Sequence, residues 1–293
     1  MRNIDFVKLF KYFSVLSFLV VGATVVLFFT KGLNYGVDFR GGVEMQVKFQ
    51  ESVEAGELRS KLDGLYLSQL QSIGASAQNE FLLKLDTDDM DLNVLSSKVE
   101  QVLVKNYGAG KFEILKTDIV GPKAGEELRS SAFKAVLWAI LAIMIYLALR
   151  FDYKFAPGAV VALLHDVLII IGVFIITEKE FSLQIVAALL AVIGYSVNDT
   201  VVIYDRVREV EADHPNLSTF EVINRSINET MARTINTSLT TLGVSIVMLI
   251  WGGPVIHDFF FAMTVGLVLG VYSTIFIAVP MTVVFEKFTN KAA

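Results

Sequence analysis

The side chains with the strongest potential for chemistry are two carboxylates that interrupt long apolar runs. Asp199, with Asn198 before it, lies inside one run, and Asp166, with His165 before it, lies near the middle of another. A charged side chain in hydrocarbon costs about 2.5–3.5 kcal/mol even on the mildest scale, so such residues usually face protein or water and serve a function. Asp199 is therefore predicted to be a proton or ion relay site, and the His165–Asp166 pair is a second candidate.

One arginine offers these carboxylates a counter-charge. Arg233 precedes a later apolar run, where it can serve either as an anchor at the membrane edge or as the partner of Asp199. Its depth allows Asp166, Asp199 and Arg233 to share one polar core. Thr237 and Ser238 follow one turn later, where their hydroxyls either hydrogen-bond neighbouring helices or line a water path.

The remaining residues exclude several other classes of function. The chain has no GxxxxGK[ST] phosphate loop, no HExxH motif and no cysteine, and its three histidines are scattered, so we expect no cofactor and no metal. A net charge of −5 without a basic stripe argues against a nucleic-acid partner. The stretch GYSVN (Gly194–Asn198) is similar to a GxSxG nucleophile elbow but lacks its last glycine. An intramembrane serine protease, with Ser196 as nucleophile and His165 as base, is therefore a weaker alternative.

The elements that must position these residues are membrane helices. The 293-residue chain is 54% hydrophobic with a mean hydropathy of +0.58, above the usual range of soluble domains. A spanning helix needs about 20 mostly apolar residues. Six stretches meet this length: Tyr12–Thr30, Phe133–Leu149, Pro157–Thr177, Phe181–Tyr204, Ile235–Trp251 and Phe259–Phe285. The glycines Gly194, Gly243, Gly266 and Gly270 are expected to allow close packing of these helices.

Basic residues predict how these segments are oriented. If all six segments span, the basic groups before the first, between the second and third, between the fourth and fifth, and after the sixth fall on one side. Their members are Arg2, Lys8, Lys11, Arg150, Lys154, Arg206, Arg208, Arg225, Arg233, Lys287 and Lys291. By the positive-inside rule both termini are cytoplasmic, and Lys31 is the one discordant charge. The mixed-charge stretch 205–234 is expected to form two helices along the inner membrane face.

The stretch 34–129 is predicted to be a small domain on the opposite side. Strand patterns occupy Val43–Phe49, Leu70–Gln78, Glu80–Asp86 and Lys111–Val120, with helices at Glu54–Leu65 and after a cap at Asp88 or Asp89. The order βαββαβ is typical of an α+β ferredoxin-like fold. Before the first strand, GVDFRGG contains Asp38, Gly41 and Gly42, and it is either a tight turn where the chain leaves the membrane or part of a binding site.

Several motifs are similar to those of the SecD/SecF family of export membrane proteins, which are related to proton-driven transporters of the RND type. They are VDFRGG, VGPKAGEELRSSA (Val120–Ala132), HDV (His165–Val167), IGYSVNDTVVIYDRVRE (Ile193–Glu209), INETMARTINTSLTTL (Ile227–Leu242) and WGGP (Trp251–Pro254). A single six-helix unit, an RND-type half with one small outside domain, resembles the SecF branch. Residues 50–115 carry no such motif.

The resemblance implies a bacterial inner-membrane protein in three parts: residues 1–33 with the first helix, a periplasmic domain at 34–129, and helices two to six at 130–293. It implies a subunit of the SecD–SecF complex that uses the proton motive force to promote export and membrane insertion, without being an enzyme. Asp199 and Arg233 match the family's relay aspartate and arginine, with Asp166 as a further member. The implied partners are SecD, the SecYEG translocon, YajC, the YidC insertase, unfolded exported polypeptide and lipid. A proton-driven exporter of small molecules or lipids is the main alternative, although such exporters usually carry a larger outside domain.

Overall fold

Six long helices form the body of the molecule. The computed structural model describes residues 4–73, 79–86, 91–151 and 155–292. The helices are α1 (Val7–Thr30), α5 (Pro122–Arg150), α6 (Ala156–Thr177), α7 (Leu183–Asp213), α8 (Thr219–Trp251) and the continuous run of α9 (Pro254–Ser273), the π-helix η1 (Thr274–Ala278) and α10 (Val279–Ala292). Within the described ranges, six helices are long and apolar enough to cross a membrane, which confirms the predicted segments.

The centre of the bundle is built from α6, α7 and the α9–η1 run, about half of whose residues are buried, whereas α1, α5 and α8 expose most of their surface. Small residues allow this closeness. A Cβ on Gly266 of α9 would overlap the side chain of Val192 on α7, and one on Gly270 would lie 3.2 Å from Ser196. Nothing lies within 4 Å of such an atom on Gly194 or Gly243, so the packing prediction was wrong for these two glycines in the isolated chain.

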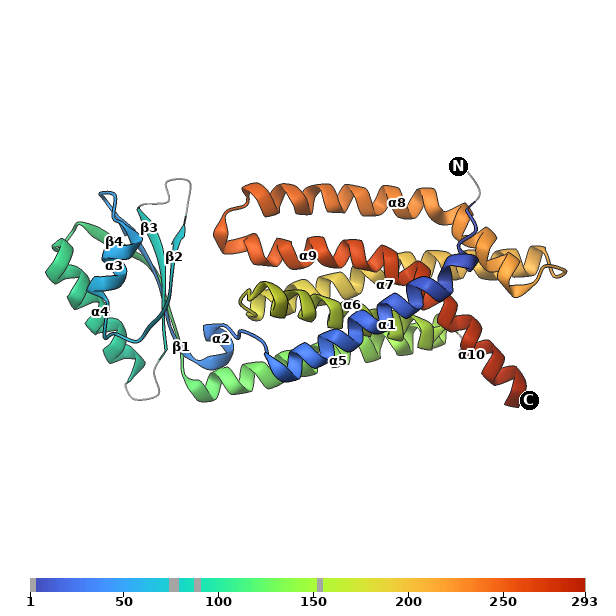
Figure 1. The fold of residues 1–293 in the computed structure, drawn as a ribbon, viewed down its shortest axis with the longest axis horizontal. Coiled ribbons are helices and arrows are strands. Elements are labelled where there is room, and N and C mark those ends of the chain that lie inside the picture. The colour runs from blue at the N-terminus through green and yellow to red at the C-terminus, as the bar shows by residue number, and fades with distance from the viewer. Residues whose placement is uncertain (1–3, 74–78, 87–90, 152–154, 293) are drawn as a thin grey trace.

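A four-stranded antiparallel sheet lies beyond one end of the bundle, while both chain ends lie near the other (Figure 1). The strands are β1 (Gly42–Phe49), β2 (Leu67–Ile73), β3 (Glu80–Leu85) and β4 (Phe112–Val120), in the order β2-β3-β1-β4. Helices α3 (Ala55–Lys61) and α4 (Leu92–Tyr107) cover the face turned away from the bundle (Figure 1). This arrangement confirms the ferredoxin-like βαββαβ prediction.

Alternation along the strands explains the core of this domain. Side chains at every second position of β1 and β3, such as Val43, Met45 and Leu83, are fully buried against apolar residues of α4. The carboxylate of Asp91 caps α4 by accepting hydrogen bonds from the backbone N–H of Asn93 at 2.8 Å and Val94 at 3.3 Å. The predicted cap was wrong, because Asp91 and not Asp88 or Asp89 directly precedes the helix. Asp88 and Asp89 themselves lie outside the described residues. The predicted end of the second strand, at 74–78, lies outside them as well.

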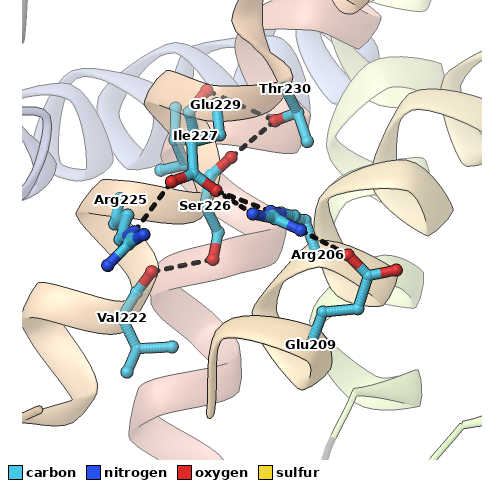
Figure 2. A network of polar contacts seen from close by, with 8 residues as sticks. All are labelled: Arg206, Glu209, Val222, Arg225, Ser226, Ile227, Glu229 and Thr230. Atoms are coloured by element: carbon cyan, nitrogen blue, oxygen red, sulfur yellow. Dashed lines mark hydrogen bonds and ion pairs between the residues drawn. The ribbon is translucent and has the colours of Figure 1, made fainter. Parts of the chain in front are cut away.

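The stretch predicted to form separate helices on the inner membrane surface instead continues α7 and α8. Ser218 and Glu221 form a capping box at the start of α8, because each side chain bonds the other's backbone N–H. Figure 2 shows an ion pair that joins the two helices: Glu229 of α8 accepts from Arg206 of α7 at 2.6 Å. Within α8, Glu229 also accepts from Arg225 at 2.7 Å. Arg206 and Arg225 were predicted only as basic residues that set the orientation.

The N-terminal segment is held against the same end of α8. Asn228 donates to the carbonyl of Ile4 at 2.8 Å and accepts from its N–H at 2.9 Å, and Asn224 accepts from the N–H of Phe6 at 2.8 Å. The two asparagines are one helical turn apart, so they bond the backbone at alternate residues of the segment. This contact fixes the start of α1 to α8.

Candidate functional site

Asp166 lies fully buried in a cluster of hydroxyl groups. Its Oδ2 accepts hydrogen bonds from Ser196 Oγ of α7 at 2.9 Å and from Ser273 Oγ of α9 at 2.8 Å. On the other side, Nδ1 of the preceding His165 lies 3.0 Å from Asp166 Oδ1. Three helices therefore meet at one carboxylate, whose buried oxygens are compensated by polar partners.

His165 continues the polar path toward α1. Its ring stacks on Tyr272 with 5.8 Å between ring centres, and Tyr272 Oη lies 2.7 Å from Ser17 Oγ on α1. The second ring nitrogen of His165, Nε2, is buried and has no hydrogen-bond partner among the described residues. A path of polar side chains therefore runs from Asp166 through His165 and Tyr272 to α1.

Asp199 is also buried, at 2% exposure, but it faces α8. Its Oδ2 accepts a single hydrogen bond, 3.1 Å long, from Ser238 Oγ. One turn earlier on α7, Tyr195 donates to the backbone carbonyl of Thr237 at 2.6 Å and holds the two helices together beside the carboxylate. Asp199 is thus a buried carboxylate with one geometrically well-formed hydroxyl donor, and burying a charge with so few donors is costly.

Two other predicted members of the relay, Thr237 and Arg233, lie close enough to Asp199 to interact electrostatically with its carboxylate. Arg233 is exposed, and neither a hydrogen bond nor an ion pair joins its guanidinium to Asp199. Asn198 is also exposed, while Thr237 Oγ1 donates within its own helix to the carbonyls of Arg233 and Thr234 at 3.0 Å each. The structure therefore does not join Asp166, Asp199 and Arg233 by direct contacts: the two aspartates have separate hydrogen-bond partners, and Arg233 is exposed.

Three residues of the polar interior were missed from the sequence. Ser273 bonds Asp166, and Thr200 Oγ1 lies 2.8 Å from Thr274 Oγ1. Ser273 and Thr274 stand where α9 passes into the π-helix, a widening of the helical turn that is frequent at functional sites. Ser196 was considered only as a nucleophile. Hydroxyls spaced inside apolar runs were the available signal, but the π-helix that turns two of them inward leaves no mark in the pattern.

The same geometry argues against the serine protease. Ser196 Oγ donates to the Asp166 carboxylate, and no hydrogen bond joins it to His165. A nucleophilic serine needs a base within hydrogen-bond reach, and here the carboxylate separates serine from histidine. Across the residues that the structure describes, no group of three or more His, Cys, Asp or Glu side chains could hold a metal ion.

The residues of GVDFRGG lie at the junction of the sheet domain and the bundle. The short helix α2 (Val37–Arg40) precedes Gly41 and Gly42, whose φ angles are +86° and +136°. An L side chain rarely adopts these angles, and a Cβ on Gly41 would lie 2.8 Å from Pro122 Cα at the start of α5. Asp38 Oδ2 accepts from the backbone N–H of Leu183 at 2.9 Å. The predicted tight turn is therefore present, with a helical turn before it that the sequence did not reveal.

Comparisons with known proteins agree with this architecture. Residues 99–287 match the family model for the C-terminal part of the protein export membrane proteins SecD/SecF, and residues 26–53 match the SecD/SecF GG motif. The "Protein translocase subunit SecF" of Calditerrivibrio nitroreducens is 40% identical over 279 residues, covering 94% of this chain and 92% of the relative. That of Rickettsia typhi is 33% identical over 291 residues, covering 99% and 94%.

Solved structures give the same result. SecDF of Thermus thermophilus, described as a translocon-associated membrane protein, superposes with a TM-score of 0.82 at 34% identity. The match covers 97% of this chain and 39% of the SecDF chain. A second SecDF structure, in a form called super-membrane-facing, has a TM-score of 0.74 at 33% identity over 100% of this chain and 40% of the other. The chain belongs to the SecD/SecF family of protein export membrane proteins, as a translocase subunit of the SecF type.

Proposed function

We propose that this chain couples proton movement through its helix bundle to late stages of protein export and membrane-protein insertion. Asp199 is the proton-exchanging group, and the observation that carries this role is its burial at 2% exposure with a single hydroxyl partner. Asp166 and His165 form a second exchange site. Arg233 approaches Asp199 during the cycle, since it lies one turn before Thr237 and Ser238 on the helix that faces this carboxylate.

The energy of a proton gradient is of the right size for such a role. One elementary charge crossing ~150 mV releases about 3.5 kcal/mol, at about 2.3 kcal/mol per 100 mV. Moving a two-state equilibrium from 1:99 to 99:1 takes about 5.5 kcal/mol, so one charge biases a conformational change strongly without completing it. A pH gradient across the membrane adds to this driving force.

The proposed partner is SecD, within an assembly that contains the SecYEG translocon, with YajC and YidC as further members. The outward direction of Arg233 supports this, because a cation on a membrane helix is costly unless a partner covers it. The outer face of α8 is also broadly apolar, with Leu239, Val244 and Trp251 exposed. The proposed location is the bacterial inner membrane, with both termini cytoplasmic and the sheet domain periplasmic.

Substitution of Asp199 tests the relay. Asp199→Asn should accumulate normally, because the amide has nearly the same shape and costs less to bury than a charge. It should lose the part of export that depends on the proton gradient. Arg233→Met should also fail, and Arg233→Lys should retain part of the activity because an ammonium lacks the guanidinium fork.

The measurement is the amount of protein that membranes carrying each variant export, with the proton gradient present or collapsed. This amount is divided by the amount of the variant chain in the same membranes. Asp213→Asn is the matched control, because it makes the same substitution at an exposed position of the same helix. Gradient-dependent export by Asp199→Asn at normal abundance would show that Asp199 is not the exchanging group.

A further inference from the structure

The GVDFRGG segment touches neither Asp166 nor Asp199, yet it contacts the sheet domain and two helices of the bundle, α5 and α7. On one side it lies against the sheet domain and α5. Gly41 leaves no room for a side chain beside Pro122, and a Cβ on Gly125 of α5 would lie 3.1 Å from the carbonyl carbon of Phe39. A Cβ on Gly41 would also lie 3.1 Å from the carbonyl oxygen of Val120 at the end of β4, so this side packs against both the sheet domain and α5.

On its other side the segment is bonded to the start of α7. Gly36 donates to the carbonyl of Phe181 at 2.9 Å, and Phe181 donates to the carbonyl of Asn34 at 2.7 Å, as in a short parallel strand pair. The rings of Phe39 and Phe181 stack with 6.1 Å between their centres. Asp38 then reaches the first residue of α7 through its hydrogen bond with the N–H of Leu183.

That hydrogen bond supplies a helix cap that the sequence around α7 does not provide. Ser182 occupies the N-cap position but makes no side-chain capping bond, and the first turn of α7 contains no acidic residue. The first N–H groups of any helix lack partners within the helix, and a carboxylate satisfies them while also matching the positive end of the helix dipole. Asp38, more than a hundred residues earlier in the chain, fulfils this need.

An ion pair adds a second tie between the same two parts. Lys84 of β3 pairs with Glu180, which lies just before α7, and also lies 3.3 Å from Glu44 of β1. The lysine side chain is only 11% exposed and that of Glu180 only 16%, so dissolved salt weakens the attraction between the two charges little. Both ties connect the sheet domain with the outer end of α7.

The helix that starts at this junction carries the proposed relay residue. Helix α7 runs without interruption from Leu183 to Asp213, and Asp199 lies about 24 Å along it at ~1.5 Å per residue. We propose that Asp38 is a positioning residue for the relay: its cap makes the outer domain and α7 one rigid unit, so that movement of α7 during proton exchange is passed directly to the outer domain. This inference rests on the proposed role of Asp199, on which it builds.

Two substitutions separate the cap from the charge. Asp38→Asn keeps an acceptor and a good capping residue, whereas Asp38→Leu keeps a similar shape without any acceptor. Asp38→Leu should lose gradient-dependent export severalfold at normal abundance, and Asp38→Asn should stay close to the unmodified chain. Asp118→Ala is the control, because it removes an exposed carboxylate of the same domain that does not touch α7.

A distance measurement reports the coupling itself. Because the chain has no cysteine, spin labels at Ser97→Cys on α4 and Gln184→Cys on α7 mark only these two exposed positions. In the full chain in lipid, the distance distribution should be narrow and unchanged when a proton gradient is imposed. It should broaden in Asp38→Leu and remain narrow in Asp38→Asn and Asp118→Ala.

The outcomes distinguish this inference from the relay proposal. If the distance changes with the gradient in the otherwise unmodified chain, the rigid unit does not exist, whatever the variants do. If Asp199→Asn abolishes gradient-dependent export while Asp38→Leu alters neither export nor distance, the relay stands and the positioning role fails. If Asp199→Asn exports normally while Asp38→Leu broadens the distance, the rigid unit stands and the relay fails.

Discussion

Asp166 and Asp199 are both buried carboxylates, yet their surroundings differ. Asp166 accepts from two serine hydroxyls and contacts His165, whereas Asp199 accepts from Ser238 alone. Each hydrogen bond offsets part of the cost of removing a charge from water. Asp166 therefore has more hydrogen-bond donors than Asp199, and this difference is the reason why we propose Asp199 as the exchanging group.

A substitution at Ser273 tests how far Asp166 depends on its donors. Ser273→Ala removes one of the two hydroxyl donors and leaves a buried acceptor incompletely satisfied, so the free energy of unfolding should fall by about 1–3 kcal/mol. Denaturant unfolding of the purified chain in mixed micelles measures this value. Ser131→Ala, at an exposed position of α5, is the control and should change it little. Equal stability of Ser273→Ala and the control would mean that the hydroxyl contributes nothing to holding Asp166.

Sequence reasoning found the two carboxylates because a charge inside an apolar run is conspicuous. It did not find their partners. Whether Ser196 or Ser273 faces Asp166 depends on the rotation of three helices and on the adjoining π-helix, which are set by packing and not by local pattern. The outward direction of Arg233 was hidden for the same reason, since its position in the sequence fixes its depth but not its side of the helix.

At the scale of whole elements, glycine placement decides which helices approach closely. Gly266 of α9 faces Val192 of α7 without room for a Cβ, and Gly270 faces Ser196. The approach at Gly270 also keeps Ser196 within reach of Asp166. The small-residue spacing alone did not separate these glycines from Gly194 and Gly243, which face open space in the isolated chain.

This difference gives a matched pair of substitutions. Gly266→Ala forces α9 away from α7, so unfolding free energy should fall by about 1–3 kcal/mol, as for other overpacked cores. Gly194→Ala adds the same methyl group at a position with nothing within 4 Å and should be neutral or slightly stabilising, because alanine favours the helix. Thermal unfolding of both variants in the same lipid environment measures the difference. Equal effects would contradict the α7–α9 contact.

The strands of the outer domain were predictable because burial alternates along them, as at Val43, Met45 and Val47. The segments that connect this domain to the bundle were less predictable. Helix α2 and the cap on α7 depend on contacts between residues such as Asp38 and Leu183, which are far apart in the chain. The sequence analysis predicted separate amphipathic helices at the ends of α7 and α8 that lie opposite the sheet domain. The change in composition there suggested a boundary, but the backbone of each helix continues unbroken.

For the whole molecule, charge placement predicts the orientation. Both termini and the inner ends of α7 and α8 lie at the end of the bundle opposite the sheet domain (Figure 1). Lys31, a cation at the sheet-domain end, lies 2.7 Å from Glu178, and this hydrogen bond lowers the pKa of the Glu178 carboxyl below its usual value. The positive-inside rule counts Lys and Arg and not net charge, so this ion pair leaves Lys31 in the count, where the larger number of cations at the opposite end outweighs it.

Labelling of single cysteines tests this orientation, and the absence of native cysteine makes each label specific. The two labelling positions are exposed and lie at opposite ends of the molecule: Ser97→Cys is on α4 and Asn216→Cys is between α7 and α8. In intact cells whose outer membrane is permeable to it, a maleimide that cannot cross the inner membrane should modify Ser97→Cys, and it should modify Asn216→Cys only after the inner membrane is opened. The reverse pattern would place the sheet domain in the cytoplasm. The domain could then act on no polypeptide that emerges from the export channel, so the proposed function would fall together with the orientation.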